Sequence, residues 1–218
     1  MCLPPHSLTI VHRPFLQLTG PIPTEIGTLK SLQVLGLHTL DLSGSLPSEL
    51  GLLAVLDGLY AQSNPRITGS IPSEIAMLEK LRALALDSTK MSGTIPEELY
   101  DVPIRFFDLS GSNFSGTISN KIWNWTNLTE FAISNNHFSG TLPDIPAWSN
   151  LNRFQVNGNV KLTGSFPISV CKTYQMAGQS QRVIADCPSD DGGDARLVCP
   201  DYACCTQCCG TGVCSPME

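Results

Sequence analysis

Cysteines are the residues whose number and spacing most clearly indicate chemistry in this chain. Eight of the nine fall within the last 48 residues, and only Cys2 lies elsewhere. An even cluster in a loop-rich segment indicates a framework of disulfide bonds, which forms in an oxidising compartment. We predict disulfide bonds among Cys171, Cys187, Cys199, Cys204, Cys205, Cys208, Cys209 and Cys214.

Two patterns in the same tail are compatible with metal binding instead. Cys205 and Cys208 have the Cys-x-x-Cys spacing of zinc ligands, but a thiolate site requires a reducing compartment. The acidic loop at 190–194 offers carboxylates to calcium, but it lacks the ligand spacing and the distal glutamate of an EF-hand. Disulfides explain the tail better, because each one stabilises a segment with few apolar residues by about 2–4 kcal/mol. We therefore predict no metal site and no cofactor.

Catalytic motifs do not occur in the sequence. The histidines at 6, 12, 38 and 137 are scattered, with no serine or cysteine nucleophile motif beside them. Neither Gly-x-Ser-x-Gly nor His-Glu-x-x-His is present, and neither are the glycine-rich loop and catalytic loop of a kinase. We expect a binding protein rather than an enzyme.

Charge and apolar patterning restrict the partners. Charged residues make up 15% of the chain and the net charge is -6, which is the wrong sign for a protein that follows a phosphate backbone. The longest apolar run, at 50–60, is interrupted by Gly51 and Asp57 and is too short to cross a bilayer. Neither nucleic acid nor a membrane span is therefore expected.

Potential glycosylation sites indicate the secretory route. The Asn-x-Ser/Thr triplet, which accepts N-linked glycans, occurs at Asn113, Asn124 and Asn127. The N-terminal residues have no basic region followed by an apolar stretch, so no signal peptide is visible. Together with the cysteines, the triplets favour an extracellular location, secreted or at the cell surface.

Most of the chain before the cysteine tail is built from a repeated element, and the repeat is the strongest pattern in the sequence. The tetrapeptide Gly, any residue, bulky apolar residue, Pro recurs with glycines 24, 25, 24, 23, 24 and 24 residues apart. Apolar residues three and then two apart, such as Leu81, Leu84 and Leu86, precede each glycine, which is the register of a leucine-rich repeat. The glycines are Gly20, Gly44, Gly69, Gly93, Gly116, Gly140 and Gly164, and the copy at Gly116 has Ser119 in place of the proline.

This repeat predicts an α/β repeat solenoid. A unit of about 24 residues cannot bury its own apolar stripe, whereas stacked units form one continuous core and one parallel sheet. We predict that sheet on the concave face, with short 3-10 or helical segments on the convex side. The expected organisation is an irregular N-terminal segment at 1–17, about seven repeats at 18–170, and a disulfide-rich cap at 171–218. The strands should lie side by side around Leu35, Leu59, Leu84, Phe107, Phe131 and Phe154.

Inward-turned asparagines are expected at the end of some strands. A side-chain amide there satisfies backbone groups that are exposed where the chain turns away from the sheet. The residues at this position are Asn64, Asn136 and Asn159. The other coils have Leu40, Thr89 and Ser112 instead, which predicts an interrupted polar ladder.

The repeats resemble a known family. The segments 18–29 and 91–99 are similar to the plant-type leucine-rich repeat of receptor-like kinases, receptor-like proteins and polygalacturonase inhibitors. The resemblance covers roughly residues 18 to 170. It implies a right-handed superhelix with an extra short strand in each coil, and a concave face or flank that binds a protein, a peptide or a polysaccharide. A monomer, or one with a co-receptor partner, is expected. Family ectodomains begin with a cysteine-paired cap, and a lone Cys2 leads us to expect an uncapped or truncated N-terminal end.

Outward-pointing strand positions define a candidate ligand-binding surface. Tyr60 and Phe106 are aromatic residues suited to stacking on a sugar ring or anchoring a peptide side chain, although they could simply pack against adjoining coils. Asp87, Asp108 and Glu130 could form an acidic lane, with Arg153 and His38 at its ends, or an ordinary solvated surface. The full predicted site consists of Tyr60, Gln62, Asp87, Phe106, Asp108, Glu130, Arg153 and Gln155.

Two further features have competing explanations. Small residues align in one column at Thr39, Ser63 and Ser88, and a regular row of this kind can bind ice or a crystalline polymer. The column is broken by Gly111, Asn135 and Gly158, which makes this function the weaker one. Among the tryptophans, we expect Trp123 in the core, whereas the sequence leaves Trp125 and Trp148 undecided.

The function that the sequence favours is extracellular recognition, receptor-like or inhibitor-like, of a protein, peptide or polysaccharide. One alternative is a structural or adhesive extracellular solenoid that acts as a spacer. Another is an intracellular scaffold whose cysteine tail binds zinc.

Overall fold

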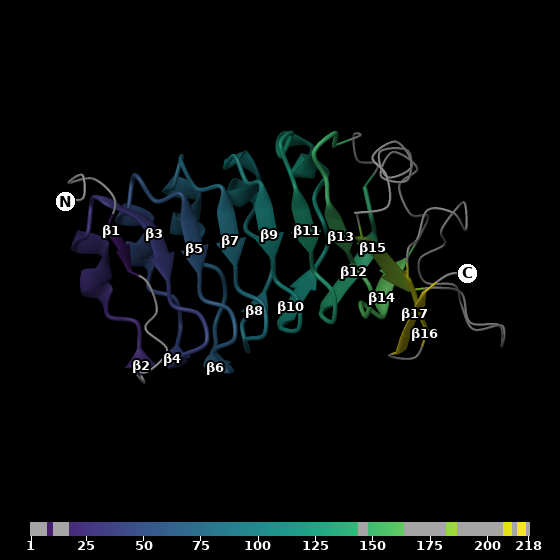
Figure 1. Cartoon of the computed structure of the whole chain (residues 1–218), viewed down its shortest axis with the longest axis horizontal. Helices are drawn as coiled ribbons and strands as arrows, with labels where there is room; N and C mark the ends of the chain where they lie inside the picture. The colour runs from purple at the N-terminus through teal and green to yellow at the C-terminus, as the bar shows by residue number, and fades with distance from the viewer. Residues whose placement is uncertain are drawn as a thin grey trace, which may run out of the picture.

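The computed structural model describes residues 18–143 and 148–163 with their side chains, and the backbone of four further strands. These strands are β1 (Leu8–Ile10), β15 (Arg182–Asp186), β16 (Gln207–Gly210) and β17 (Val213–Pro216). The coils follow one another along the long axis of the molecule (Figure 1). The chain is thus a solenoid, as the repeat predicts.

The main sheet takes one strand from each coil and is parallel over most of its width. Its central strands are β3 (Leu32–Gly36), β5 (Gly58–Tyr60), β7 (Ala83–Ala85), β9 (Phe106–Asp108), β11 (Glu130–Ala132) and β13 (Arg153–Gln155). Their register aligns Leu35, Leu59, Leu84, Phe107, Phe131 and Phe154, which confirms the prediction. Strands β1 and β15 extend this sheet at its two ends, and β16 and β17 add an antiparallel pair beyond β15.

A second strand occurs in each coil, as the resemblance implies. These strands form two smaller parallel sheets, one of β2 (Thr19–Pro21), β4 (Asp41–Gly44) and β6 (Arg66–Ile67), the other of β8 (Ser92–Gly93), β10 (Asn113–Gly116), β12 (His137–Thr141) and β14 (Lys161–Thr163). The repeat glycine lies in or just after these strands with positive φ, for example 82° at Gly69. A Cβ added there would be 3.1 Å from Ser45 Cβ in the preceding coil. Backbone conformation and close packing between coils therefore both favour glycine.

Short 3-10 helices follow the repeat tetrapeptide in the first five coils. They are η1 (Thr24–Thr28), η2 (Ser48–Leu52), η3 (Ser73–Met77), η4 (Glu97–Asp101) and η5 (Asn120–Asn124). The first four are each preceded by the repeat proline, whose carbonyl accepts the first helical bond and which needs no N–H there. In the copy without proline, Ser119 takes this place and its hydroxyl accepts a bond from the Lys121 N–H.

The core changes from leucine to aromatic side chains along the solenoid. In the first three coils the central buried residues are leucines, whereas Phe107, Phe131 and Phe154 occupy the same column in the next three and stack on one another. Trp125 packs against Phe107 with ring centroids 4.9 Å apart. Trp148 contacts Phe154 at 6.4 Å.

The expectation for Trp123 is wrong, because its side chain is 52% exposed while Trp125 and Trp148 are buried. Trp125 follows η5 at the position that the buried Leu53 and Leu78 occupy after their own helices. Trp123 instead aligns with Gly51, at a position that is occupied by glycine or alanine in the first three coils.

The inward-turned asparagines are confirmed, and hydroxyl groups partly continue their ladder. Asn64, Asn136 and Asn159 are buried, and the amide of each bonds backbone groups of its own and the preceding coil. Thr89 and Ser112 lie 3.1 Å apart through their hydroxyls, and both donate to the Leu86 carbonyl. The ladder changes chemistry in those two coils rather than stopping.

The column of small residues has a conformational explanation. Thr39, Ser63 and Ser88 have φ of 57°, 58° and 57°. Gly111, Asn135 and Gly158, which seemed to break the column, have φ of 63°, 53° and 72°. All six share the left-handed turn that ends the main strand, and short polar residues and glycine tolerate this conformation best. The alignment therefore needs no ice-binding surface.

Candidate functional site

The outer surface of the main sheet has a floor of small residues on which a few large side chains stand. Tyr60 is half-buried, and its ring folds over Gly58, where an added Cβ would lie 2.7 Å from a ring carbon. Burial, and to a lesser extent the carboxylate of Asp57, raise the pKa of the Tyr60 hydroxyl. Gly58 thus positions the aromatic side chain that the sequence singled out.

Four of the predicted residues come together in one group, which we call the charge cluster: Asp108, Glu130, Arg153 and Gln155. The Arg153 guanidinium forms an ion pair with Glu130 and a second with Asp108 at 3.4 Å. Its other terminal nitrogen donates to Gln155 Oε1 at 2.5 Å. Asp108 also accepts the Ser110 N–H at 2.8 Å. One cation therefore holds side chains from three neighbouring coils in place.

Asp87 lies at the edge of this cluster and adds a third carboxylate to it. Burial, followed by the negative charge of Asp108, raises the pKa of Asp87, although the Ser88 hydroxyl and Arg153 act in the opposite direction. Burial also raises the pKa of Glu130 despite its contact with Arg153. Three carboxylates share one arginine, so the region carries net negative charge near neutral pH.

The raised pKa of Asp87 predicts a pH-dependent effect of Asp87→Asn on stability. The folded state holds this proton more tightly than the unfolded state, so the contribution favours folding at low pH and is lost as pH rises through the folded pKa. We expect Asp87→Asn to raise the free energy of unfolding at pH 7. Near pH 3 it should leave that free energy almost unchanged, because the ordinary carboxyl pKa is about 4 and Asp87 is then largely protonated in both states. Urea unfolding at both pH values measures this difference. A variant that is less stable than the wild type at pH 7 would contradict it.

The remaining predicted residues lie on the same surface but form no hydrogen bond or ion pair with the charge cluster among the described residues. Phe106 is half-buried beside Ala83 and Glu130 in the register of the sheet. Gln62 is half-buried, and its Oε1 is buried with no hydrogen-bond partner among the described atoms. Within the cluster, Asp108 and Gln155 are themselves buried. A ligand would therefore touch Arg153 and Glu130 more readily than these two.

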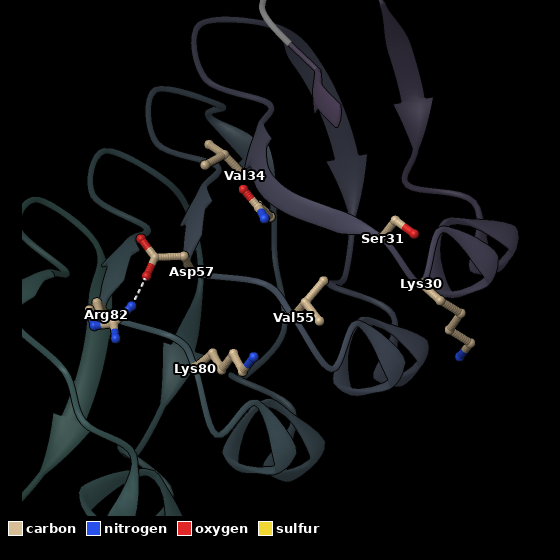
Figure 2. Close-up of a pocket in the computed structure, with 8 residues that line it drawn as sticks. Lys30, Ser31, Val34, Val55, Asp57, Lys80 and Arg82 are labelled. Carbon is tan, nitrogen blue, oxygen red and sulfur yellow. Dashed lines mark hydrogen bonds and ion pairs between the residues drawn. The ribbon is translucent and has the colours of Figure 1, made fainter. Parts of the chain in front are cut away.

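A pocket that the sequence analysis did not identify lies where the main strands begin. It encloses about 440 Å³ between the first three coils and is lined by Lys30, Gln33, Val34, Val55, Lys80 and Arg82, with Ser31 and Asp57. We call it the strand-entry pocket (Figure 2). Ser31, Val55 and Lys80 lie directly before the first buried leucine of their coils, and Gln33, Asp57 and Arg82 directly after it. These two columns were the signal in the sequence.

A second pocket, of about 390 Å³, occupies the same place three coils further on. Its lining consists of Arg105, Asn127, Thr129, Ser149, Asn150 and Asn152. Amides and hydroxyls replace the two lysines of the strand-entry pocket, and Arg105 is the one cation in this lining. Asn127 is also one of the three predicted glycosylation sites, and all three, Asn113, Asn124 and Asn127, are exposed.

The cysteine predictions fall outside the part of the chain whose side chains are described. Cys208, Cys209 and Cys214 lie in β16 and β17, where only the backbone is described, and the other five lie outside every described range. Within residues 18–143 and 148–163, no group of three or more metal-binding side chains occurs. No helix in the described chain combines the length and apolarity needed to cross a bilayer.

Comparison with known proteins supports the architecture. The family model described as Leucine Rich Repeat matches residues 127–148. No curated protein matches the chain. Among solved structures, the leucine-rich-repeat ectodomain of the receptor kinase SOBIR1 from Arabidopsis thaliana is 29% identical, with a TM-score of 0.54, over 59% of this chain and 70% of that one.

Two other similar structures are receptor complexes. The plant peptide hormone receptor RGFR1, in complex with RGF2, is 28% identical over 78% of this chain and 30% of its own, with a TM-score of 0.58. The Arabidopsis receptor kinase HAESA, in complex with the peptide hormone IDA and the co-receptor SERK1, is 23% identical over 92% of this chain and 34% of its own, with a TM-score of 0.69. The last similarity shows the fold alone. This chain spans about a third of either receptor structure.

Proposed function

We propose that this chain, a leucine-rich-repeat solenoid of the plant type, is an extracellular recognition module that binds a peptide or a peptide segment of a protein through the outer surface of its main sheet. The charge cluster is the observation that carries this proposal. Its arginine is fixed by partners from two other strands, so it offers a ligand a rigid, charged contact. Half-buried ionisable groups with shifted pKa values on an open surface favour a functional role.

The surrounding surface fits a peptide. Small residues at Ala83 and Ala85 form the floor beside Tyr60 and Phe106, whose half-buried rings can contact a peptide side chain. The structure of the peptide hormone receptor RGFR1 with RGF2 supports a peptide ligand. A protein co-receptor, of the kind that accompanies HAESA and its hormone, is part of the same proposal. A polysaccharide remains the second candidate, since the same rings could stack on sugars.

The test is capture from two pools on the immobilised full chain. One pool contains secreted plant proteins and peptides, and the other contains solubilised cell-wall polysaccharides. We expect saturable capture from the first pool at micromolar concentrations, weakened about tenfold or more by Arg153→Ala, because this change removes a fixed charged contact and leaves Glu130 and Asp108 unpaired.

Arg66→Ala is the matched control for this experiment. Arg66 also forms an ion pair, with Asp41 at 2.5 Å, but it lies in β6, outside the main sheet. The control should bind as the wild type does. The proposal fails if neither pool yields a partner at micromolar concentration, or if both arginine variants behave alike. Capture only from the polysaccharide pool would replace the peptide with a sugar ligand.

The extracellular part of the proposal has its own test in the cysteine tail. If the protein follows the secretory route, intact-mass spectrometry of the unreduced chain should show two hydrogens lost for each disulfide, and no free thiols among Cys171 to Cys214. The zinc-binding alternative predicts the opposite: reactive thiols and stoichiometric metal. Glycan mass at Asn113, Asn124 or Asn127 would support the same route.

A further inference from the structure

We propose that the strand-entry pocket binds a carboxylate of the peptide ligand, an aspartate or glutamate side chain or its C-terminus, at a site separate from the charge cluster. The inference rests on the proposed function for the identity of the ligand, but the pocket and its charge stand by themselves. The pocket lies before β5 and β7, whereas Asp87 and the charge cluster lie within or after the strands.

The hollow follows from a difference between consecutive coils. The middle coil has only Ala54 and Val55 directly before Leu56, so no long side chain from these two positions fills the space between the flanking coils. The flanking coils place Lys30 on one side and Lys80 on the other (Figure 2). Short side chains therefore form the floor, and long cationic ones form the rim.

Backbone hydrogen bonds fix the spacing of consecutive coils at this edge, by which we mean the end of the sheet where the strands begin. The Asp57 N–H donates to the Gln33 carbonyl at 2.7 Å, and the Arg82 N–H donates to the Asp57 carbonyl at 2.8 Å. The next coil continues the same ladder, since the Arg105 N–H donates to the Arg82 carbonyl at 2.7 Å. The charged side chains thus project from a rigid sheet edge and not from a free loop.

The charge of the pocket is positive in a protein whose net charge is -6. Three cations, Lys30, Lys80 and Arg82, face a single acid, Asp57, which forms an ion pair with Arg82. Lys30 donates to the Leu52 carbonyl at 3.1 Å, and Lys80 forms no ion pair within the described part of the chain. An incoming anion would find one cation without a competing carboxylate and two more beside it, which favours charge-assisted binding.

Size and continuity favour an acidic residue over an acidic polymer. A pocket of about 440 Å³ accommodates a single side chain, and Val34 and Val55 offer apolar contact to its methylene groups. A polyuronate would need cations repeated along the edge. Beyond Arg105, however, the equivalent positions are Thr129 and Asn152, which are neutral.

The experiment uses the isotope-labelled full chain, titrated with N-acetyl-glutamate methylamide and, separately, with the glutamine analogue. Backbone amide shifts in NMR spectra report the site. We expect the glutamate probe to shift the Gln33, Asp57 and Arg82 amides, and the neutral probe to leave them in place. Lys80→Gln should weaken binding several-fold and Lys80→Gln/Arg82→Gln about tenfold. The double variant Lys121→Gln/Lys161→Gln removes equal charge from η5 and β14 and should bind as the wild type does. Like the Lys80/Arg82 pair, it includes one ion-paired cation, here Lys121.

Three results would overturn the inference: equal shifts with both probes, unchanged affinity of the Lys80 variants, or equal weakening in the control. A third titration, with trigalacturonate, tests the polymer. Tighter binding of this sugar acid, with shifts extending to Arg105, would assign the edge to polysaccharide instead. Binding of the glutamate probe by a chain that captures no secreted peptide would refute the proposed function while leaving the carboxylate site intact.

Discussion

Replacing Phe131 by alanine should lower the free energy of unfolding by about 3–5 kcal/mol, the usual cost of removing a buried aromatic ring. The Phe131 side chain is fully buried between Phe107, with ring centroids 5.8 Å apart, and Phe154, at 5.3 Å. Trp125 closes a third side at 6.4 Å. The cavity would interrupt stacking between coils, and in a solenoid each coil is stabilised by its neighbours. Urea unfolding followed by circular dichroism measures the loss.

Two comparisons separate this cavity effect from general damage to the sheet. Phe131→Leu should cost much less, because leucine fills the same column in the first three coils at Leu35, Leu59 and Leu84. Phe106→Ala, one residue before Phe107 but half-buried on the outer face, should also cost less than Phe131→Ala. An equal loss in Phe106→Ala and Phe131→Ala would show that the stack does not carry the stability of these coils.

Asn136→Ala is the second substitution with a large expected effect, a loss of about 2–6 kcal/mol, because two buried backbone groups stay unsatisfied at about 1–3 kcal/mol each. The amide nitrogen of Asn136 donates to the carbonyls of Leu109, Ile133 and Ser134 at 2.8, 3.1 and 3.2 Å. Its oxygen accepts the Phe114 N–H at 2.9 Å. Alanine would leave the buried Leu109 carbonyl and Phe114 N–H without a partner, whereas the Ile133 carbonyl keeps the Asn159 amide and the Ser134 carbonyl keeps the Gly111 N–H. The free energy of unfolding is again the measured quantity.

The neighbouring residue provides the control. Asn135 has φ of 53° and occupies the left-handed turn position that Gly111 and Gly158 fill in other coils, so Asn135→Gly should be nearly neutral. Asn136→Thr should fall between the two, since Thr89 bonds the Leu86 carbonyl at the equivalent place. If Asn136→Ala proves no more destabilising than Asn135→Gly, the inward amide contributes little to the coil.

The sequence predicted inward-facing features accurately where their columns were correctly aligned. The leucine and phenylalanine column, the repeat glycines from Gly20 to Gly140 and the three asparagines are observed as expected. The prediction of a core position for Trp123 is wrong, because the column of a residue decides its burial more than its apolarity does. Trp123 shares its position with Gly51, whereas Trp125 shares the buried position of Leu53 and Leu78.

Outward-facing features were predicted only as candidates. The acidic lane was identified from strand positions, but its actual arrangement depends on Arg153 reaching Glu130 and Asp108, which are 23 and 45 residues earlier in the chain. The strand-entry pocket was not anticipated at all. It depends on the short side chain of Val55 lying between the longer ones of Lys30 and Lys80 in adjacent coils.

By itself, the sequence determined the period, the strand register and the buried column of this solenoid. Each coil must complete the apolar stripe of the next, so the pattern repeats in every unit and can be recognised without coordinates. Only the tertiary structure decided which surface charges meet and where the surface is hollow. Outward positions need not repeat, and their interactions depend on how side chains of different length from separate coils fit together in space.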